Sequence, residues 1–312
     1  MHVPLHLPFK ASLLAAFVAT TLLVPTVGVA QTSQAAYVQG VQMPAWVERG
    51  GVKQPLAAGI ALMPGDKVST GKDSRLLLKM SEGSEIKLGE NAQFNINSLS
   101  TRQENRQTFV SAALEVAKGA FRFTTDARLK LSSKRDVSVK FATVTAGIRG
   151  TDLWGKSAPD RDIVCLIEGD IGVQRDGDSE FRMNQALQFY ITPKTADNKV
   201  DRSKPAPAVV PVPPEKLAEW AVETEISKGK GALVKGGKWK VVLVSSDNQA
   251  DALTQYDSLR TLGYPAEIHP RLASGKRVYD VRVAGLPSKE EAQALGTALE
   301  SQVNGANVRV TL

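Results

Sequence analysis

The sequence predicts two domains: a β-rich N-terminal domain of the β-roll or solenoid type and a small α+β C-terminal domain. Between residues 47 and 192, apolar and polar residues alternate with period two and glycines interrupt the pattern, as is typical of strands and turns. The stretch 238–312 alternates strand-like and helix-like segments in the order βαββαβ. A chain of 312 residues also exceeds the usual size of one domain.

The first thirty residues predict a secretory signal peptide. Lys10 precedes an apolar run from Ala11 to Val24, and Gly28-Val29-Ala30 supplies the small side chains that signal peptidase needs. The run of about fourteen residues is shorter than the roughly 20 of a membrane-spanning helix. We therefore expect cleavage after Ala30 and no stable membrane span, with an uncleaved anchor as the alternative. Residues 31 to about 44 are mostly small or polar, so we expect residues 31–46 to be disordered.

Composition excludes several classes of site. Cys165 is the only cysteine, so an intramolecular disulfide and a cysteine-rich zinc site are both excluded. Its apolar neighbours predict a buried side chain rather than a nucleophile. His269 is the only histidine after the leader, which excludes histidine-cluster metal sites. We expect no metal and no cofactor.

A wall-acting enzyme is the least favoured class. Two carboxylate pairs are available, but one pair is typical of a surface turn and the other of a helix N-terminus, where acids interact favourably with the helix dipole. The pairs are Glu82 with Glu85 and Glu290 with Glu291. No nucleophile motif accompanies them, so we expect no catalytic residues.

The exported chain is basic. Removing Lys10 leaves 38 basic and 32 acidic residues, a formal net charge of +6. Such a balance favours anionic partners such as cell-wall polymers or lipid headgroups. Because we expect the chain to be exported, we expect no nucleic acid partner. Many basic residues alternate with apolar ones, and ordinary solvated strand faces explain that pattern equally well.

A glycine-centred unit recurs in the β-rich domain. Its copies are Leu114-x-Val116-x-x-Gly119-x-Phe121-x-Phe123, Val164-x-Leu166-x-x-Gly169-x-Ile171-x-Val173 and the looser Leu78-x-Met80-x-x-Gly83-x-x-Ile86-x-Leu88. We expect each glycine to turn the chain, so that apolar residues of both flanking strands face one interior.

Residues 47–192 resemble a FecR-type periplasmic domain. The resemblance rests on Gly65-Asp66-Lys67-Val68-Ser69-Thr70-Gly71, Ser74-Arg75-Leu76, Gly83-Ser84-Glu85-Ile86-Lys87-Leu88 and Ala146-Gly147-Ile148-Arg149-Gly150-Thr151. It implies a β-rich, solenoid-like domain that is frequent in envelope signalling proteins. We expect the Arg149-Gly150-Thr151 step to form a tight turn, with Arg149 paired to a carboxylate such as Asp152, rather than a ligand contact.

Residues 193–237 read as a linker. Five of the eleven residues from Lys204 to Pro214 are proline, which stiffens the backbone and separates modules. We expect a short amphipathic helix near 215–227, with Trp220 packed on the β-rich domain. The glycines between 229 and 237 predict a flexible hinge.

The stretch 238–312 predicts a four-stranded antiparallel sheet that carries two helices on one face and leaves the other face open. The expected strands are Lys238–Val244, Ala266–His269, Arg277–Val283 and Val308–Leu312, and the expected helices run from Gln249 to Leu262 and from Pro287 onward. Ser288 is an apt N-cap, with Glu291 at the capping-box position.

This stretch resembles a SPOR domain, most closely from Tyr279 to Ala292 and at Trp239-Lys240-Val241 followed by Ser245. The resemblance implies binding of peptidoglycan, a preference for glycan strands stripped of stem peptides, and concentration at division sites. It places the glycan-binding residues on the open face, at Lys240, Val242, Ser245, Val278, Asp280 and Arg282. The family often has glutamine at the position of Val242, arginine at that of Asp280 and Gly-Pro at that of Ala284-Gly285.

We therefore predict a non-catalytic periplasmic envelope protein that binds peptidoglycan through its C-terminal domain. The FecR-like domain would scaffold or recognise a second envelope component, with envelope or division proteins as further partners and the septum as a further location. One alternative is an envelope-stress or signalling sensor that acts through a membrane partner. Another is a SPOR-like fold used for protein docking rather than glycan binding.

Overall fold

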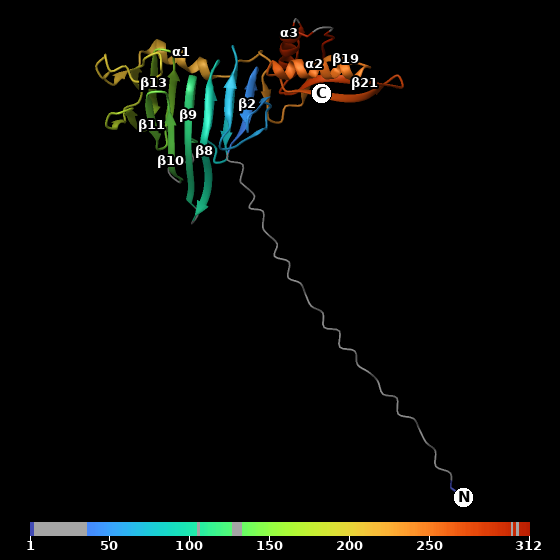
Figure 1. Ribbon diagram of the computed structural model, residues 1–312, viewed down its shortest axis with the longest axis horizontal. Coiled ribbons are helices and arrows are strands. Elements are labelled where there is room, and N and C mark those ends of the chain that lie inside the picture. Colours follow the sequence, from blue (N-terminus) through green and yellow to red (C-terminus); the bar gives the residue numbers. More distant parts are fainter. Residues whose placement is uncertain (3–35, 105–106, 127–132, 301, 304–305) are drawn as a thin grey trace. The chain divides into compact units, whose positions relative to one another are not determined.

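The computed structural model describes the chain except residues 3–35, 105–106, 127–132, 301 and 304–305. Apart from Met1 and His2, the predicted signal peptide therefore lies outside the described residues. Within the described part of the chain, no helix is long and apolar enough to cross a membrane. The β-rich and α+β fold classes are both confirmed (Figure 1).

One layer of the β-rich domain is an antiparallel sheet in which β1 pairs with β4 and β18 on one side and with β6 on the other. The order continues β6–β7–β9–β12–β13–β16–β17. Its strands are β1 (Ala36–Gln42), β4 (Ala61–Leu62), β6 (Arg75–Met80), β7 (Glu85–Leu88), β9 (Gln107–Thr124), β12 (Asp152–Ser157), β13 (Arg161–Glu168), β16 (Gln188–Pro193), β17 (Val210–Pro211) and β18 (Leu233–Val234).

The second layer has the order β3–β2–β5–β8–β9–β10–β11–β14–β15. All of its pairs are antiparallel except β9 with β10, which run parallel. The strands not yet named are β2 (Ala45–Arg49), β3 (Val52–Pro55), β5 (Lys67–Thr70), β8 (Gln93–Glu104), β10 (Ser133–Lys140), β11 (Val144–Ile148), β14 (Ile171–Arg175) and β15 (Phe181–Met183).

Strand β9 belongs to both layers and changes layer at Gly119. Residues up to Lys118 pair with β8, and residues from Gly119 onward pair with β12. Gly119 has a φ of +89°, and a Cβ there would lie 2.7 Å from the Cα of Ala92, so the crossing requires glycine. The expectation that each repeated glycine turns the chain holds for Gly83 and Gly169. At Gly119 the strand bends and continues instead.

The apolar faces of the two layers form the core. Phe94 of β8 stacks on Phe121 of β9 with 5.8 Å between ring centroids, and Phe141 meets Phe121 edge to face at 6.4 Å. Full burial of each such side chain stabilises the fold by about 1.5–3 kcal/mol. Cys165 is buried as predicted, and burial raises the pKa of its thiol to about 12, so it stays protonated at neutral pH.

The prediction of disorder for residues 31–46 is wrong from Ala36 onward. Strand β1 is paired along both edges, and Val38 and Val41 are completely buried. A short, weakly apolar segment of this kind becomes a strand because its neighbours supply pairing and cover, which local composition does not encode.

The expected ion pair of Arg149 with Asp152 is also wrong. The Asp152 carboxylate accepts hydrogen bonds from Arg122 on the adjacent strand, with an Nη2–Oδ2 distance of 2.7 Å. The expected turn is present, because Gly150 adopts a φ of +97° between β11 and β12.

Helix α1 (Pro214–Thr224) lies where the linker helix was predicted and ends three residues early. Trp220 stacks on Trp154 of β12 with 4.5 Å between centroids and 5° between planes, which confirms its packing on the β-rich domain. The glycine-rich stretch that follows is attached to the β-rich domain in its middle, because Leu233 is buried and β18 pairs with β1.

The C-terminal module has the predicted order of elements. Its sheet runs β20–β21–β19–β22, with α2 and α3 on one face. The elements are β19 (Trp239–Ser246), α2 (Gln249–Thr261), β20 (Ala266–Ala273), β21 (Lys276–Leu286), α3 (Lys289–Glu300) and β22 (Arg309–Thr311).

Apolar spacing along these elements explains the packing of the module. Val241, Val281 and Val283 of the sheet and Leu259 and Leu295 of the helices are all buried in one core. The Ser288 hydroxyl accepts a hydrogen bond from the Glu291 backbone N–H at 3.3 Å, as the cap prediction requires. The Glu291 carboxylate accepts N–H groups of the preceding linker, at Gly229 and Gly231, rather than completing the capping box.

Candidate functional site

The face of the C-terminal sheet opposite α2 and α3 is the candidate site, here called the open face. Cross-strand register places three groups of residues side by side on it. They are Glu267, Arg282, Val242 and Arg309; His269, Asp280 and Ser245; and Arg271 with Val278. Lys240 lies opposite Ala284 and Thr311 at one end.

A β-bulge brings two predicted residues onto this face together. Val242 and Ser245 are three positions apart, so strict alternation would place them on opposite faces. The register shifts between Val242 and Val244, and Ser245 then pairs with Asp280 while Val242 pairs with Arg282. Leu243 is the extra residue, and its side chain is buried in the core of the module.

Asp280 organises the centre of the open face. Only 4% of this residue is exposed. Its carboxylate accepts hydrogen bonds from the Ser245 hydroxyl at 2.7 Å, Arg271 Nε at 2.8 Å and Arg309 Nη2 at 3.0 Å. Two guanidinium groups from the outer strands are therefore held against the middle of the sheet.

The charges around Asp280 also set its protonation. Burial acts to raise the pKa of its carboxyl, but the hydrogen bonds from Arg271 and Ser245 and the positive charges of Arg271 and Arg309 outweigh it, so the pKa lies below its ordinary value. Asp280 is therefore ionised at neutral pH and keeps both arginines in place.

The remaining predicted residues divide into exposed and covered ones. Arg282 lies within 3.4 Å of the Glu267 carboxylate, which is mostly exposed. Val242 is only 3% exposed, between Arg282 and Arg309 in register. Long arginine side chains cover such positions with their aliphatic stems, so Val242 supports the arginines and offers no surface of its own.

Sequence reasoning missed Arg271 and Arg309. The strand at 266 was expected to end at His269, yet β20 continues to Ala273 and carries Arg271 onto the open face. Arg309 sits between Val308 and Val310 in an expected strand, so alternation alone would have placed it opposite the buried side chains. The open face thus presents the cations Lys240, Arg271, Arg282 and Arg309.

A second polar cluster lies inside the β-rich domain. Asp162 accepts hydrogen bonds from Ser157 Oγ at 2.8 Å and from Lys194 Nζ at 3.2 Å, and Lys194 also donates to Ser157 Oγ at 2.9 Å. All three side chains are buried, so a substrate cannot reach them and the cluster ties β12, β13 and the end of β16 together. No group of metal-ligating side chains occurs among the residues that the structure describes.

These observations define a strand-rich domain followed by a small α+β module with an open basic face. Residues 235–309 match the family model of the SPOR domain, and residues 66–172 match the model described as FecR protein. Both resemblances seen in the sequence are thereby confirmed. SPOR domains bind peptidoglycan, and both domain types are typical of envelope proteins.

The chain has low sequence identity to two solved structures. Two solved structures are described as a "putative anti-sigma factor from Parabacteroides distasonis ATCC 8503", at 1.65 Å and 2.50 Å resolution. Each is 11% identical over 78% of this chain and over 98% and 96% of its own length. Their TM-scores are 0.36 and 0.35. No curated protein matches the chain.

Proposed function

We propose that this chain is a non-catalytic periplasmic envelope protein that binds peptidoglycan through the open face of its SPOR module. The observation that carries the proposal is the set of four cations on that face, two of them held by the buried carboxylate of Asp280. The face lies opposite the helices, so a flat polymer can lie along it.

The chemistry of the face suits a glycan strand without stem peptides. Such a strand offers hydroxyl groups, acetamido carbonyl oxygens and the lactyl carboxylates that peptide removal leaves free. Guanidinium groups donate several hydrogen bonds in a fixed plane and bind carboxylates strongly. Because Asp280 already fixes Arg271 and Arg309, little side-chain entropy remains to be lost on binding.

Sedimentation of the purified full chain with purified sacculi tests this proposal. The double substitution Lys240→Gln with Arg282→Gln removes the two cations of the open face that Asp280 does not hold. We expect the affinity for sacculi to fall at least tenfold, because a single hydrogen bond to a charged group contributes about 1.5–3 kcal/mol and about 1.4 kcal/mol corresponds to a tenfold change in affinity.

The matched control removes two cations from the helical side of the same module, with Arg260→Gln and Lys289→Gln. It should bind like the parent chain. Equal loss in both double variants would reduce the effect to net charge, and no loss in the first would sink the proposed binding face.

A second candidate is a sensor that reports envelope state through a membrane partner, and the match of residues 66–172 to the FecR model favours it. The two functions are compatible, since the SPOR module would anchor the sensor to the wall. In-cell crosslinking through the β-rich domain tests the sensor role, and recovery of an inner-membrane protein supports it.

Docking of a protein on the open face is a third candidate, and retained sedimentation with protein-free sacculi argues against it.

Location follows from the same proposal. Export through the predicted signal peptide would place the chain in the periplasm, and preference for peptide-free glycan would concentrate it at the septum, where division proteins are further partners. A fluorescent fusion with the Lys240→Gln and Arg282→Gln changes should lose septal enrichment while remaining exported.

A further inference from the structure

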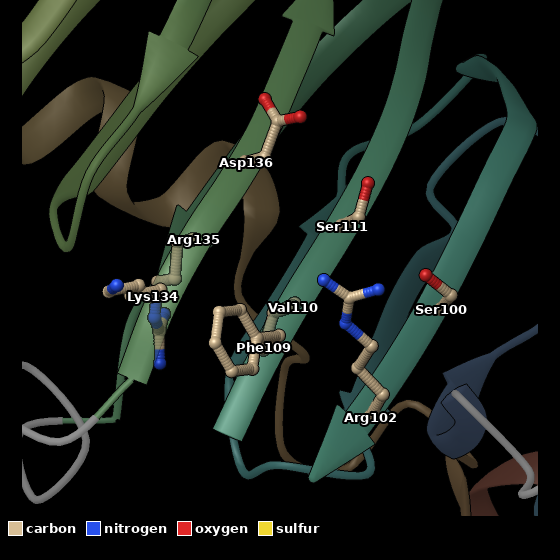
Figure 2. Close-up of a pocket in the computed structure, with 8 residues that line it drawn as sticks. All are labelled: Ser100, Arg102, Phe109, Val110, Ser111, Lys134, Arg135 and Asp136. Atoms are coloured by element: carbon tan, nitrogen blue, oxygen red, sulfur yellow. The ribbon is translucent and has the colours of Figure 1, made fainter. Parts of the chain in front are cut away.

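An open groove of about 390 Å³ lies on the outer face of β8, β9 and β10 (Figure 2). It is at the end of these strands farthest from the layer crossing at Gly119. Its volume falls within the about 300–1,000 Å³ of ligand sites. The groove is well separated in sequence from the SPOR module. Neither family match assigns it a ligand, and it is here called the β8–β10 groove.

The centre of the groove is an aromatic ring between two cations. Register places Arg102 on β8, Phe109 on β9 and Lys134 on β10 side by side. The Arg102 guanidinium lies 5.0 Å and Lys134 Nζ 5.7 Å from the centroid of the half-buried Phe109 ring. Figure 2 shows the ring between the two basic side chains on the same face.

The next row of the groove is small and polar. Ser100, Ser111 and Asp136 are exposed and lie side by side in register, two residues along each strand from the aromatic row. That step corresponds to about 7 Å. Hydroxyl groups both donate and accept hydrogen bonds, and the Asp136 carboxylate accepts them from sugar hydroxyls. Short side chains here let a ligand approach the sheet closely.

Arg135 holds the groove in place from behind. Arg135 lies between Lys134 and Asp136 on β10, so its side chain is on the other face of the strand. Its Nη1 donates to the hydroxyls of Ser84 at 3.1 Å and Thr125 at 3.0 Å. Both acceptors are buried. The start of β10 is thereby tied to the other layer, so Lys134 is carried on a fixed strand.

The cations of the groove keep their charge available. In the described part of the chain, neither Arg102 nor Lys134 has an ion pair, whereas several other arginines pair with carboxylates. Those pairs are Arg49 with Asp66, Arg122 with Asp152, Arg161 with Asp160 and Arg202 with Asp178. A cation stacked on an aromatic ring keeps its full charge for a ligand.

We propose that the β8–β10 groove is a second polymer-binding site, which takes a carboxylate-bearing glycan. Phe109 would contact the apolar face of a sugar ring, and Arg102 and Lys134 would bind the carboxylate beside it. Ser100, Ser111 and Asp136 would hydrogen-bond the hydroxyls of the neighbouring residue. Wall glycan without stem peptides has this composition, since its lactyl carboxylates are free.

The choice of wall glycan as the polymer rests on the proposed function of the SPOR module. With both sites on one kind of polymer, the chain would bind bivalently, and the second contact would form at a high effective concentration. The β-rich domain would then be a second wall anchor as well as a platform for partners.

The experiment measures binding of the full chain to soluble, peptide-free glycan strands and to the same strands with their carboxylates converted to amides by carbodiimide and ethanolamine. Three variants are compared with the parent: Phe109→Ala, Arg102→Gln with Lys134→Gln, and the open-face pair Lys240→Gln with Arg282→Gln. We expect each groove variant to lose about five- to tenfold in affinity. Amidation should weaken binding of the parent more than binding of the variant with Arg102→Gln and Lys134→Gln, because that variant lacks the groove cations that bind the carboxylate.

Two control variants separate loss of the groove from the effect of any substitution at Phe109 and from the effect of net charge. Phe109→Tyr keeps the ring and should retain binding, and Lys72→Gln with Lys228→Gln removes two exposed cations elsewhere and should leave affinity unchanged. Groove variants that bind like the parent, while the open-face variant loses binding, would overturn the groove and leave the SPOR proposal intact. The reverse result would support the groove and overturn the open face. If the groove variants lost affinity only for free stem peptides, measured in the same way, that result would overturn the assignment to glycan.

Discussion

The open face of the SPOR module and the β8–β10 groove both display cations on an exposed sheet, but they hold them in different ways. On the open face, the Asp280 carboxylate fixes Arg271 and Arg309, and Glu267 pairs with Arg282. In the groove, Arg102 and Lys134 lie against the Phe109 ring. Carboxylates fix geometry and cancel part of the charge, whereas an aromatic ring positions a cation without neutralising it.

The largest expected effect comes from removing the carboxylate that fixes the open face. Asp280→Ala would leave two arginines without their shared acceptor, so we expect the free energy of unfolding to fall by about 1–3 kcal/mol. Both arginines are partly exposed, which limits the loss. Chemical denaturation, followed with amide hydrogen exchange of β19 and β21, measures it.

The exposed Asp136 of the groove is the matched control. Asp136→Ala should change stability by less than about 0.5 kcal/mol. If the two substitutions had equal effects on stability, Asp280 would not be the organising group of its face.

The second effect is a dependence on pH. The folded-state pKa of Asp280 lies below the ordinary value of 3.8, so folding favours the ionised form. Its contribution to stability is complete above that ordinary pKa and is lost as pH falls through the lower folded-state pKa. Below about pH 4, the denaturation midpoint should therefore fall less steeply with decreasing pH in Asp280→Asn than in the parent chain. Parallel curves for the two proteins would contradict this.

The third effect is a difference in salt dependence between the two sites. Exposed cations without carboxylate partners are screened most strongly, and the Debye length falls to about 8 Å at 0.15 M salt. In chains with only one intact site, affinity for peptide-free glycan should fall more steeply with salt through the groove than through the open face. Isothermal titration at several salt concentrations checks the order of the two slopes, and the opposite order would refute the comparison.

The smallest effect concerns the exposed pair of Arg282 with Glu267. Glu267→Gln should change stability by less than about 1 kcal/mol, because exposed ion pairs contribute little. It also frees Arg282, so affinity for peptide-free glycan should rise less than about threefold. A large loss of affinity would mean that Glu267 itself contacts the polymer.

Much of the C-terminal module could be predicted because its signals are local. Apolar spacing along Gln249–Thr261 and Lys289–Glu300 defines the helices, and Ser288 marks the start of the second helix. The strands follow from alternation. By contrast, the local composition of β1 predicts disorder. The strand forms because it pairs with segments far along the chain, which local composition does not show.

The candidate site was predicted only in part, for the same reason. Resemblance to a known family, not periodicity, placed Val242 and Ser245 on one face, and a β-bulge brings them there. Arg271 was missed because β20 continues past its apolar start. The groove could not be predicted, since parallel pairing of β10 with β9 brings Lys134 beside Phe109 across 25 positions of sequence.

Local composition and periodicity thus decided the domain order, the fold classes, the burial of Cys165 and the elements of the SPOR module. Tertiary structure alone decided which charges are tied down and which remain available for a ligand. The physical reason is that a strand's own pattern determines which of its residues share a face, whereas register and bulges determine which residues of other strands lie beside them. Asp280 meets Arg271 and Arg309, and Phe109 meets Arg102 and Lys134, only after the strands have paired.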